Sequence, residues 1–210
     1  MTTNNEYRDL CLFVSDTASR IPQGWTINES FGNLCKNFLT GFEAAVFEKE
    51  AENGSKTVVI AFRCNNDLMD LPTIISLLKG EVSAQENNAL NLYNAVTEYY
   101  KNDDVQIEFT GWSLGGAIAQ LMASNFQNCN AVTFSALGVS NASGIDPNLS
   151  YNNIVNYTSP NDHIGNLIEH VGKTYFYYPD RLSEYDKVND MHSYSISSVS
   201  FNDKNIFIIM

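Results

Sequence analysis

The arrangement of apolar and polar positions predicts helices and strands along most of the chain. Residues 5–20 carry apolar side chains at helical spacing, whereas residues 42–49 and 57–63 have the pattern of strands. The Asn-Gly pair at residues 53–54, between these two strands, is a strong signal for a hairpin turn. The second strand contains a continuous apolar run, which is typical of a strand buried on both faces.

Two further helices are expected in the first half of the chain. Residues 68–80 crowd apolar side chains into a short segment, which predicts a short helix with a wide apolar face. Residues 83–101 predict a longer helix, because Ser83 and Glu86 are spaced as in a capping box. The inner face of this longer helix is expected to consist of Leu90, Tyr93, Val96 and Tyr100.

The centre of the chain has a strand, a glycine-rich turn and a helix in succession. Residues 105–109 alternate as a strand does, and residues 116–123 are dense in good helix formers. Between them, residues 111–115 read Gly-Trp-Ser-Leu-Gly, which is the G-x-S-x-G pattern. Strand, G-x-S-x-G and helix together are the context that the nucleophile elbow of serine hydrolases requires. Ser113 is therefore the candidate nucleophile.

The glycines of this segment have a steric explanation. A serine on a sharp strand-to-helix turn has strained backbone, and side chains next to it would collide with the adjoining strand and helix. Gly111, Gly115 and Gly116 remove those side chains. The helix that begins beside Ser113 also aims its free N–H groups and its positive dipole end at the anion formed during acyl transfer.

Strands that alternate with helices predict an α/β fold with a mostly parallel central sheet flanked by helices. The chain, residues 1–210, is long enough for a full-sized core, and we expect it to form one domain because no segment resembles a linker. Further strands are expected in the second half, at residues 131–134, 154–157, 174–178 and 205–210.

Composition narrows the classes of function. The net charge of −12 argues against nucleic acid and anionic membranes as partners, and the hydrophobic fraction of 44% excludes a disordered chain. The four cysteines are widely spaced, which favours buried free thiols in a reducing compartment over a metal site. The first residues lack the pattern of a secretory signal, so we expect a cytoplasmic protein, or one exported without a cleavable signal peptide.

A serine nucleophile needs a histidine base and a carboxylate that orients it. In sheets of this class the chain order is serine, acid, histidine, which favours His192 over His163 and His170 as the base. Asp162 is the favoured carboxylate because it follows a predicted strand, where catalytic groups of open α/β sheets gather. Other loop aspartates compete for this role, namely Asp146, Asp180, Asp186 and Asp190.

Several of these features together resemble class 3 lipases. They are Ala-Phe-Arg at residues 61–63, the short apolar helix, G-x-S-x-G-G-A at residues 111–117, and an Asn-Asp pair before a late His-Ser-Tyr. The resemblance extends from about residue 41 to residue 194 and implies an α/β-hydrolase-like fold. It places the catalytic triad on Ser113, Asp162 and His192.

The resemblance also implies an oxyanion hole. Its first donor is the backbone N–H of the residue after the serine, here Leu114, and its second lies just after the Phe-Arg strand. The family has Gly-Thr or Gly-Ser there, where this chain has Cys64 and Asn65. The N–H of Asn65 is our candidate for the second donor.

Two other positions leave alternatives open. The family has histidine before the serine, where Trp112 either lines the acyl pocket or packs in the core. Residues 68–80 fall where the family carries its lid, so this helix either opens against a lipid surface or is a fixed core helix.

The sequence therefore predicts a serine ester hydrolase that cleaves lipid acyl esters, of the lipase or phospholipase A type, through an acyl-enzyme. This chemistry needs no metal or organic cofactor, and its expected partners are the lipid or acyl-ester substrate and, transiently, a membrane or lipid interface. The alternatives are a soluble carboxylesterase for short acyl esters, a non-catalytic α/β-hydrolase-like binding protein, and a toxin-like lipid hydrolase delivered into another cell.

Overall fold

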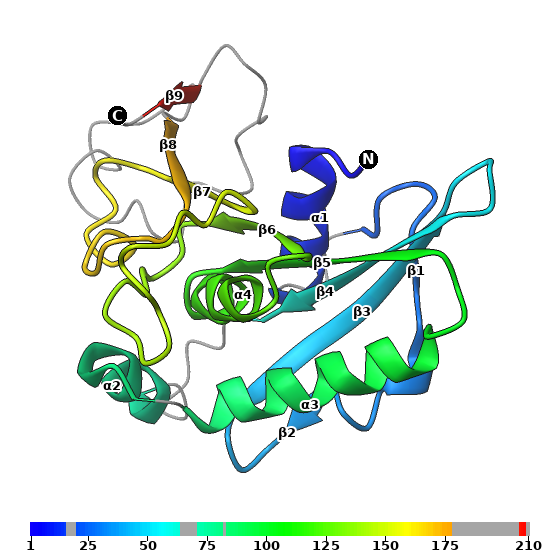
Figure 1. The fold of residues 1–210 in the computed structure, drawn as a ribbon, viewed down its shortest axis with the longest axis horizontal. Coiled ribbons are helices and arrows are strands. Elements are labelled where there is room, and N and C mark those ends of the chain that lie inside the picture. Colours follow the sequence, from blue (N-terminus) through cyan, green and yellow to red (C-terminus); the bar gives the residue numbers. More distant parts are fainter. Residues whose placement is uncertain (16–19, 64–70, 82, 178–205, 209–210) are drawn as a thin grey trace.

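A computed structural model describes residues 1–15, 20–63, 71–81, 83–177 and 206–208 (Figure 1). Its centre is a sheet in the order β1-β3-β4-β5-β6-β7-β8-β9, with β2 paired to β3 beside β1. Strands β4 to β8 are parallel to one another, whereas β3 and β9 run antiparallel to their neighbours. The predicted mostly parallel α/β sheet is confirmed.

The strands that were expected from the sequence are present, with small shifts at their ends. They are β3 (Phe42–Glu50), β4 (Lys56–Phe62), β5 (Val105–Trp112), β6 (Asn130–Phe134), β7 (Ile154–Thr158), β8 (Lys173–Tyr177) and β9 (Ile206–Ile208). Two strands of two residues each, β1 (Thr26–Ile27) and β2 (Lys36–Asn37), were not predicted, because so short a segment shows no periodicity.

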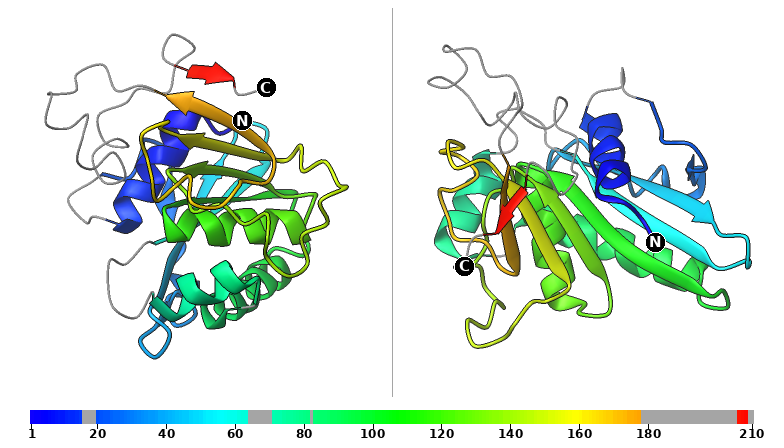
Figure 2. Two further views of the ribbon diagram at one scale, coloured as in Figure 1. Left: turned by 90° about the vertical axis from the view of Figure 1, so that its left-hand side faces the viewer. Right: turned by 90° about the horizontal axis from the view of Figure 1, so that it is seen from above.

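The helices are α1 (Asn4–Ser15), the 3-10 helix η1 (Glu29–Phe31), α2 (Leu71–Lys79), α3 (Ala84–Tyr99) and α4 (Leu114–Asn125). Helices α3 and α4 lie on one side of the sheet and α1 lies on the other (Figures 1 and 2). Both bonds of the predicted capping box are present, since Ser83 Oγ accepts from Glu86 N and Glu86 Oε2 accepts from Ser83 N.

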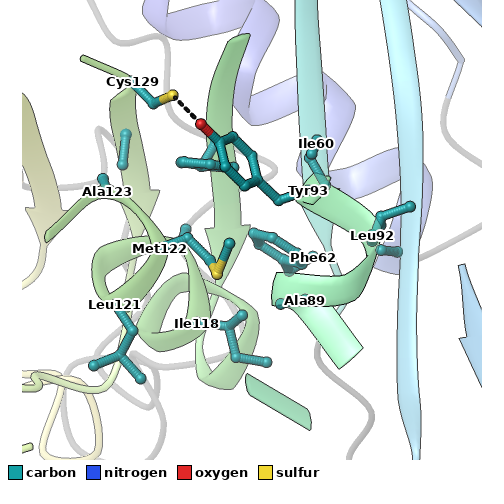
Figure 3. Packing of buried hydrophobic residues seen from close by; sticks show 14 of the residues in the cluster. Ile60, Phe62, Ala89, Leu92, Tyr93, Ile118, Leu121, Met122, Ala123 and Cys129 are labelled. Atoms are coloured by element: carbon teal, nitrogen blue, oxygen red, sulfur yellow. Dashed lines mark hydrogen bonds between the residues drawn. The ribbon is translucent and has the colours of Figure 1, made fainter. Parts of the chain in front are cut away.

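Residues 58–62 of β4 are all apolar because each face of the strand belongs to a different hydrophobic cluster. Ile60 and Phe62 pack in the cluster under α3 and α4, whereas Val59 and Ala61 pack in the cluster under α1. Figure 3 shows the first cluster, in which Phe62 lies among side chains of α3 and α4. The interpretation of this run as a strand buried on both faces is confirmed.

The predicted inner face of α3 is correct at three positions and wrong at Leu90. Tyr93, Val96 and Tyr100 are buried, but Leu90 is exposed. Ala89 and Leu92 take the inward positions instead. The buried face of α3 therefore includes Ala89 in place of Leu90. Ala89 gives a weak apolar signal in the sequence because its side chain is small.

Three of the four cysteines lie in the described part of the chain, and all three are buried free thiols. Burial raises the pKa of Cys11 to about 12 and that of Cys35 to about 11. Cys129 lies 3.7 Å from the hydroxyl of Tyr93 (Figure 3). The expectation of buried thiols is confirmed for these three, and Cys64 lies outside the described residues.

Glu6 attaches the start of α1 to β3 and to the residue before β1. One carboxylate oxygen accepts from Lys49 Nζ at 2.6 Å and from Trp25 Nε1 at 2.9 Å. The other accepts from the backbone N of Thr3 at 2.8 Å and from its hydroxyl at 2.9 Å. Although burial favours the neutral acid, these hydrogen bonds lower the pKa of Glu6 to about 2.

Candidate active site

Ser113 occupies the sharp turn between β5 and α4. Its backbone has φ 55° and ψ −122°, which makes it one of two non-glycine residues with positive φ in the described part of the chain. Such a conformation costs on the order of 1–3 kcal/mol and persists only where the surroundings impose it. The strained serine that the sequence predicts is therefore present.

The surroundings of Ser113 require the three predicted glycines. A methyl group on Gly111 would lie 2.2 Å from the carbonyl carbon of Gly115, and one on Gly115 would lie 2.2 Å from the carbonyl oxygen of Phe62. A methyl group on Gly116 would lie 2.5 Å from the Cβ of Ala136. Their predicted steric role is confirmed.

Backbone hydrogen bonds fix the turn on three sides. Ser113 N donates to the carbonyl of Phe134 at 3.1 Å, and the Ser113 carbonyl accepts from Ala117 at 3.1 Å and from Leu137 at 3.2 Å. Leu114 is the first residue of α4, where helix geometry leaves the N–H without an acceptor in the helix. The positive end of α4 thus lies beside Ser113, as an oxyanion site requires.

Asp162 lies in the turn that follows β7 and is fully buried. Its Oδ1 accepts from the backbone N of Gly165 at 2.7 Å. The turn closes around it, since Asp162 N donates to the Ser159 carbonyl at 3.0 Å and its carbonyl accepts from Asn166 N at 3.0 Å. Asn166 Nδ2 also donates to the Ser159 carbonyl at 2.8 Å.

The register of the sheet relates Ser113 to this turn. Trp112 pairs with Phe134 and Phe134 pairs with Tyr157, so β5, β6 and β7 end at the same level. Ser113 and the Asp162 turn therefore leave the same edge of the sheet, from strands two positions apart. Neighbouring strands are about 4.8 Å apart, so roughly 10 Å separates the two strand ends, which leaves room for an imidazole between them.

Ser135 lies between these two positions, and sequence reasoning missed it. It follows the end of β6 with φ 43°, donates its backbone N to the Tyr157 carbonyl at 2.7 Å, and has its hydroxyl 3.0 Å from that of Tyr177. The only available signal was its place directly after an apolar strand, which does not distinguish it from other serines.

The histidines are distributed unevenly with respect to Asp162. His163 is exposed, whereas His170 is partly buried and both of its ring nitrogens are shielded from solvent. Burial lowers the pKa of His170 to about 4, and the nearby negative charge of Asp162 opposes this shift. His192 and Asn65 lie outside the described residues, so of the five predicted site residues the structure describes Ser113, Leu114 and Asp162.

A charged cluster marks the end of β4, next to the segment predicted to supply the second oxyanion donor. Glu43 bridges Lys36 and Arg63, with 2.8 Å between its Oε1 and Lys36 Nζ. Although burial raises the pKa of Glu43, the two cations lower it overall. The backbone N of Arg63 also donates to the Glu43 carbonyl at 2.9 Å. The cluster therefore fixes the point at which the chain leaves the sheet.

A family model described as phospholipase-like, Tle-like phospholipase domain, matches residues 19–157. The chain belongs to this family. The match contains the whole Ser113 turn and ends just before the Asp162 turn.

A solved structure supports the same fold for this Tle-like phospholipase domain. Lipase II from Rhizopus niveus aligns with a TM-score of 0.54 at 14% identity, over 82% of this chain and 78% of that one. At this identity the likeness concerns the fold. The predicted lipase-family relationship and the α/β-hydrolase-like fold are both confirmed. A search of curated proteins found no match.

In this Tle-like phospholipase domain, the predicted short helix is present as α2, and it is attached at its C-terminal end. Gly80, with φ 73°, accepts from Ser143 N at 2.8 Å, and a methyl group on it would lie 2.4 Å from the Asn141 carbonyl. Ile74 packs against the core and Ile75 is exposed. These contacts hold one end of α2 on the loop after β6.

Trp112 packs against residues of both hydrophobic clusters and is partly exposed.

Among the residues that the structure describes, no group of three or more histidine, cysteine or acidic side chains could hold a metal ion. Within the same residues, no helix is long and apolar enough to cross a membrane.

Proposed function

We propose that this Tle-like phospholipase domain is a serine ester hydrolase that cleaves lipid acyl esters, of the lipase or phospholipase A type. The observation that carries the proposal is the placement of strained Ser113 and buried Asp162 on one edge of the sheet. A strained serine at a strand-to-helix turn exposes its hydroxyl to a substrate and to a base.

In the proposed mechanism His192 takes the proton of Ser113 while Oγ attacks the ester carbonyl carbon. The oxyanion that forms is stabilised by the N–H groups of Leu114 and Asn65 and by the N-terminus of α4. His192 then gives the proton to the leaving alcohol as its C–O bond breaks. Water, deprotonated by the same histidine, releases the acyl group as a carboxylic acid.

Asp162 holds the imidazole in the required tautomer and stabilises its positive charge. Its burial and its hydrogen bond from Gly165 keep the carboxylate in one position.

The first test is hydrolysis of p-nitrophenyl esters with short and long acyl chains, with Ser113→Ala in parallel. We expect activity with the parent chain and none above background with the variant, and a fluorophosphonate should label Ser113. The chain-length profile separates a lipase from a short-chain carboxylesterase. Absence of both turnover and labelling would support the binding-protein alternative instead.

A second test assigns the base. His170 competes with His192 because it lies near Asp162 and is neutral at pH 7, as its pKa of about 4 requires. We expect His192→Ala to lose at least about a thousandfold in kcat, and His170→Ala and His163→Ala to retain activity. Loss of activity in His170→Ala with a folded His192→Ala still active would reverse the assignment.

A further inference from the structure

Apart from the terminal Met1, the two most exposed large apolar side chains among the described residues lie in the turn between β2 and β3. Phe38 is 87% exposed and Leu39 is 88% exposed, and they are adjacent in sequence. We call this pair the apolar tip. A single exposed apolar residue is ordinary, but two neighbours that both project fully into solvent indicate a surface with a partner.

The apolar tip stands on a hydrogen-bonded base. Asn37 Oδ1 accepts from Leu39 N at 3.0 Å, and Asn37 Nδ2 donates to Asn88 of α3 at 3.0 Å. Asn88 Nδ2 and Gln85 Nε2 in turn donate to Thr40, both at 3.0 Å. Helix α3 therefore holds both ends of the turn, so that the fold itself presents Phe38 and Leu39 to solvent.

The register of the sheet places the tip at the same edge as Ser113. Ala44 pairs with Phe62, and Phe62 pairs with Gly111. Phe42 lies two residues before Ala44 on β3, and Ser113 lies two residues after Gly111, directly after the end of β5. Because β3 runs antiparallel to β4 and β5, Phe42 and Ser113 lie at the same level of the sheet. The β2–β3 turn, which carries the tip, lies near the start of α3 (Figures 1 and 2).

Other exposed apolar side chains follow the same edge. Ile164 and Leu167, in the loop after β7, are 52% and 60% exposed, and Ile75 of α2 is 42% exposed. Each of these residues lies on a segment that follows the carboxyl end of a strand. Apolar side chains thus project on both sides of the Ser113 position.

The size of the tip favours a lipid surface over a protein. Phe38 and Leu39 together offer on the order of 400 Å², about half of the roughly 800 Å² per partner that a stable protein interface buries. Two side chains at the end of a protruding turn are suited instead to insertion between lipid head groups. The net charge of −12 favours a zwitterionic surface over an anionic one.

We propose that the apolar tip inserts into the surface of aggregated lipid and holds the Ser113 edge of the sheet against it. This inference rests on the proposed function, because it assigns the tip to delivery of a lipid ester to Ser113. It predicts that the tip contributes to lipid binding and to hydrolysis of aggregated lipid, and not to hydrolysis of an ester dissolved in water.

The test measures binding separately from catalysis. The full chain carrying Ser113→Ala is mixed with phosphatidylcholine vesicles and its bound fraction is measured by flotation. Phe38→Ser with Leu39→Ser should weaken partitioning by about tenfold or more. Leu149→Ser, which removes a half-exposed leucine five residues before β7 at the opposite end of the sheet, is the matched control and should change it by less than about twofold.

In the chain with Ser113 intact, the tip variant should hydrolyse p-nitrophenyl butyrate at the parent rate and vesicle lipid about tenfold more slowly. Equal partitioning of parent and tip variant, or no partitioning of the parent, would overturn the proposal. A dimer that the tip variant loses would also overturn it, because the tip would then belong to a second copy. If the proposed function itself fails, p-nitrophenyl butyrate is not hydrolysed by any form, whatever the vesicles show.

Discussion

At the scale of single residues, Gly165 is the position that best tests how Asp162 is held. A methyl group on Gly165 would lie 2.6 Å from Asp162 Oδ2. The carboxylate would have to rotate, so we expect Gly165→Ala to lower kcat about tenfold or more with little change in KM. Steady-state kinetics measure this effect.

A double-mutant cycle provides the control for Gly165. In the Asp162→Asn background the glycine substitution should have no further effect on kcat, because the carboxylate that it displaces is already absent. An equal fall in kcat in both backgrounds would mean that Gly165 acts through the fold and not through Asp162.

Gly115 tests the close contact between the elbow and β4. Its methyl group would meet a backbone oxygen, that of Phe62, which cannot turn away as a side chain can. We expect Gly115→Ala to cost about 3 kcal/mol or more in the free energy of unfolding and to abolish activity. Urea denaturation is the measurement.

The matched control for Gly115 is Gly54→Ala in the β3–β4 turn. Gly54 has φ 84° and nothing within 4 Å of the added methyl group, so it should cost only about 1 kcal/mol, through its backbone conformation. If both substitutions lowered the free energy of unfolding equally, the contact with the Phe62 oxygen would not be the reason for glycine at position 115.

At the scale of elements, Glu6 adds hydrogen bonds to the packing of α1 on the sheet. Because the folded-state pKa of about 2 lies below the usual 4.5, the contribution of Glu6 is fully present above pH 4.5 and is lost as the pH falls toward 2. Glu6→Gln should therefore cost about 1–2 kcal/mol in the free energy of unfolding at pH 7, and less toward pH 2. Denaturation at several pH values measures it.

Glu98 supplies the control, because its ion pair with Lys101 is exposed to solvent on both sides. Glu98→Gln should change the free energy of unfolding by less than about 0.5 kcal/mol at any pH. A Glu6 variant that behaved in the same way would show that the four hydrogen bonds contribute nothing net.

The elements also show where sequence reasoning reaches its limit. The pattern predicted β4, β5 and the capping box of α3 because each has a local cause, such as a continuous apolar run or a serine three residues before a glutamate. The strands β1 and β2 form because they pair with β3. No local pattern in the sequence predicts that pairing.

The same distinction applies to the candidate site. Ser113 and its glycines follow from a local motif, and Asp162 follows from its place after a strand. The roles of Gly165 and Ser135 depend on what lies beside them in space, which composition and periodicity do not encode. Likewise, the sequence does not distinguish His170 from the other histidines, because its lowered pKa results from burial in the fold.

At the scale of the whole molecule, His170 links the candidate site to acid stability. Its folded-state pKa of about 4 lies below the ordinary 6.5. Between pH 6.5 and pH 4 the imidazole is therefore protonated in the unfolded chain and neutral in the folded chain. Stability should therefore fall by on the order of 2 kcal/mol as the pH drops from about 6.5 to about 4.

His170→Asn removes the titrating group and should flatten the pH dependence of the unfolding free energy in this window. Glu6 titrates mainly below it, so the Glu6 variant should keep the parent slope between pH 6.5 and 5. A His170→Asn variant with an unchanged slope would contradict the assignment of acid sensitivity to this residue.

The rate at which the buried thiols react with a reagent measures how often the protein opens and exposes them. Only a thiolate attacks a disulfide reagent, and burial with a raised pKa suppresses that form in Cys11 and Cys35. Cys11 lies on α1, Cys35 precedes β2 and Cys129 precedes β6, so each thiol reports on a different region. Labelling rates measured with Cys64 replaced by serine would thus separate the loosening of one layer from unfolding of the whole chain.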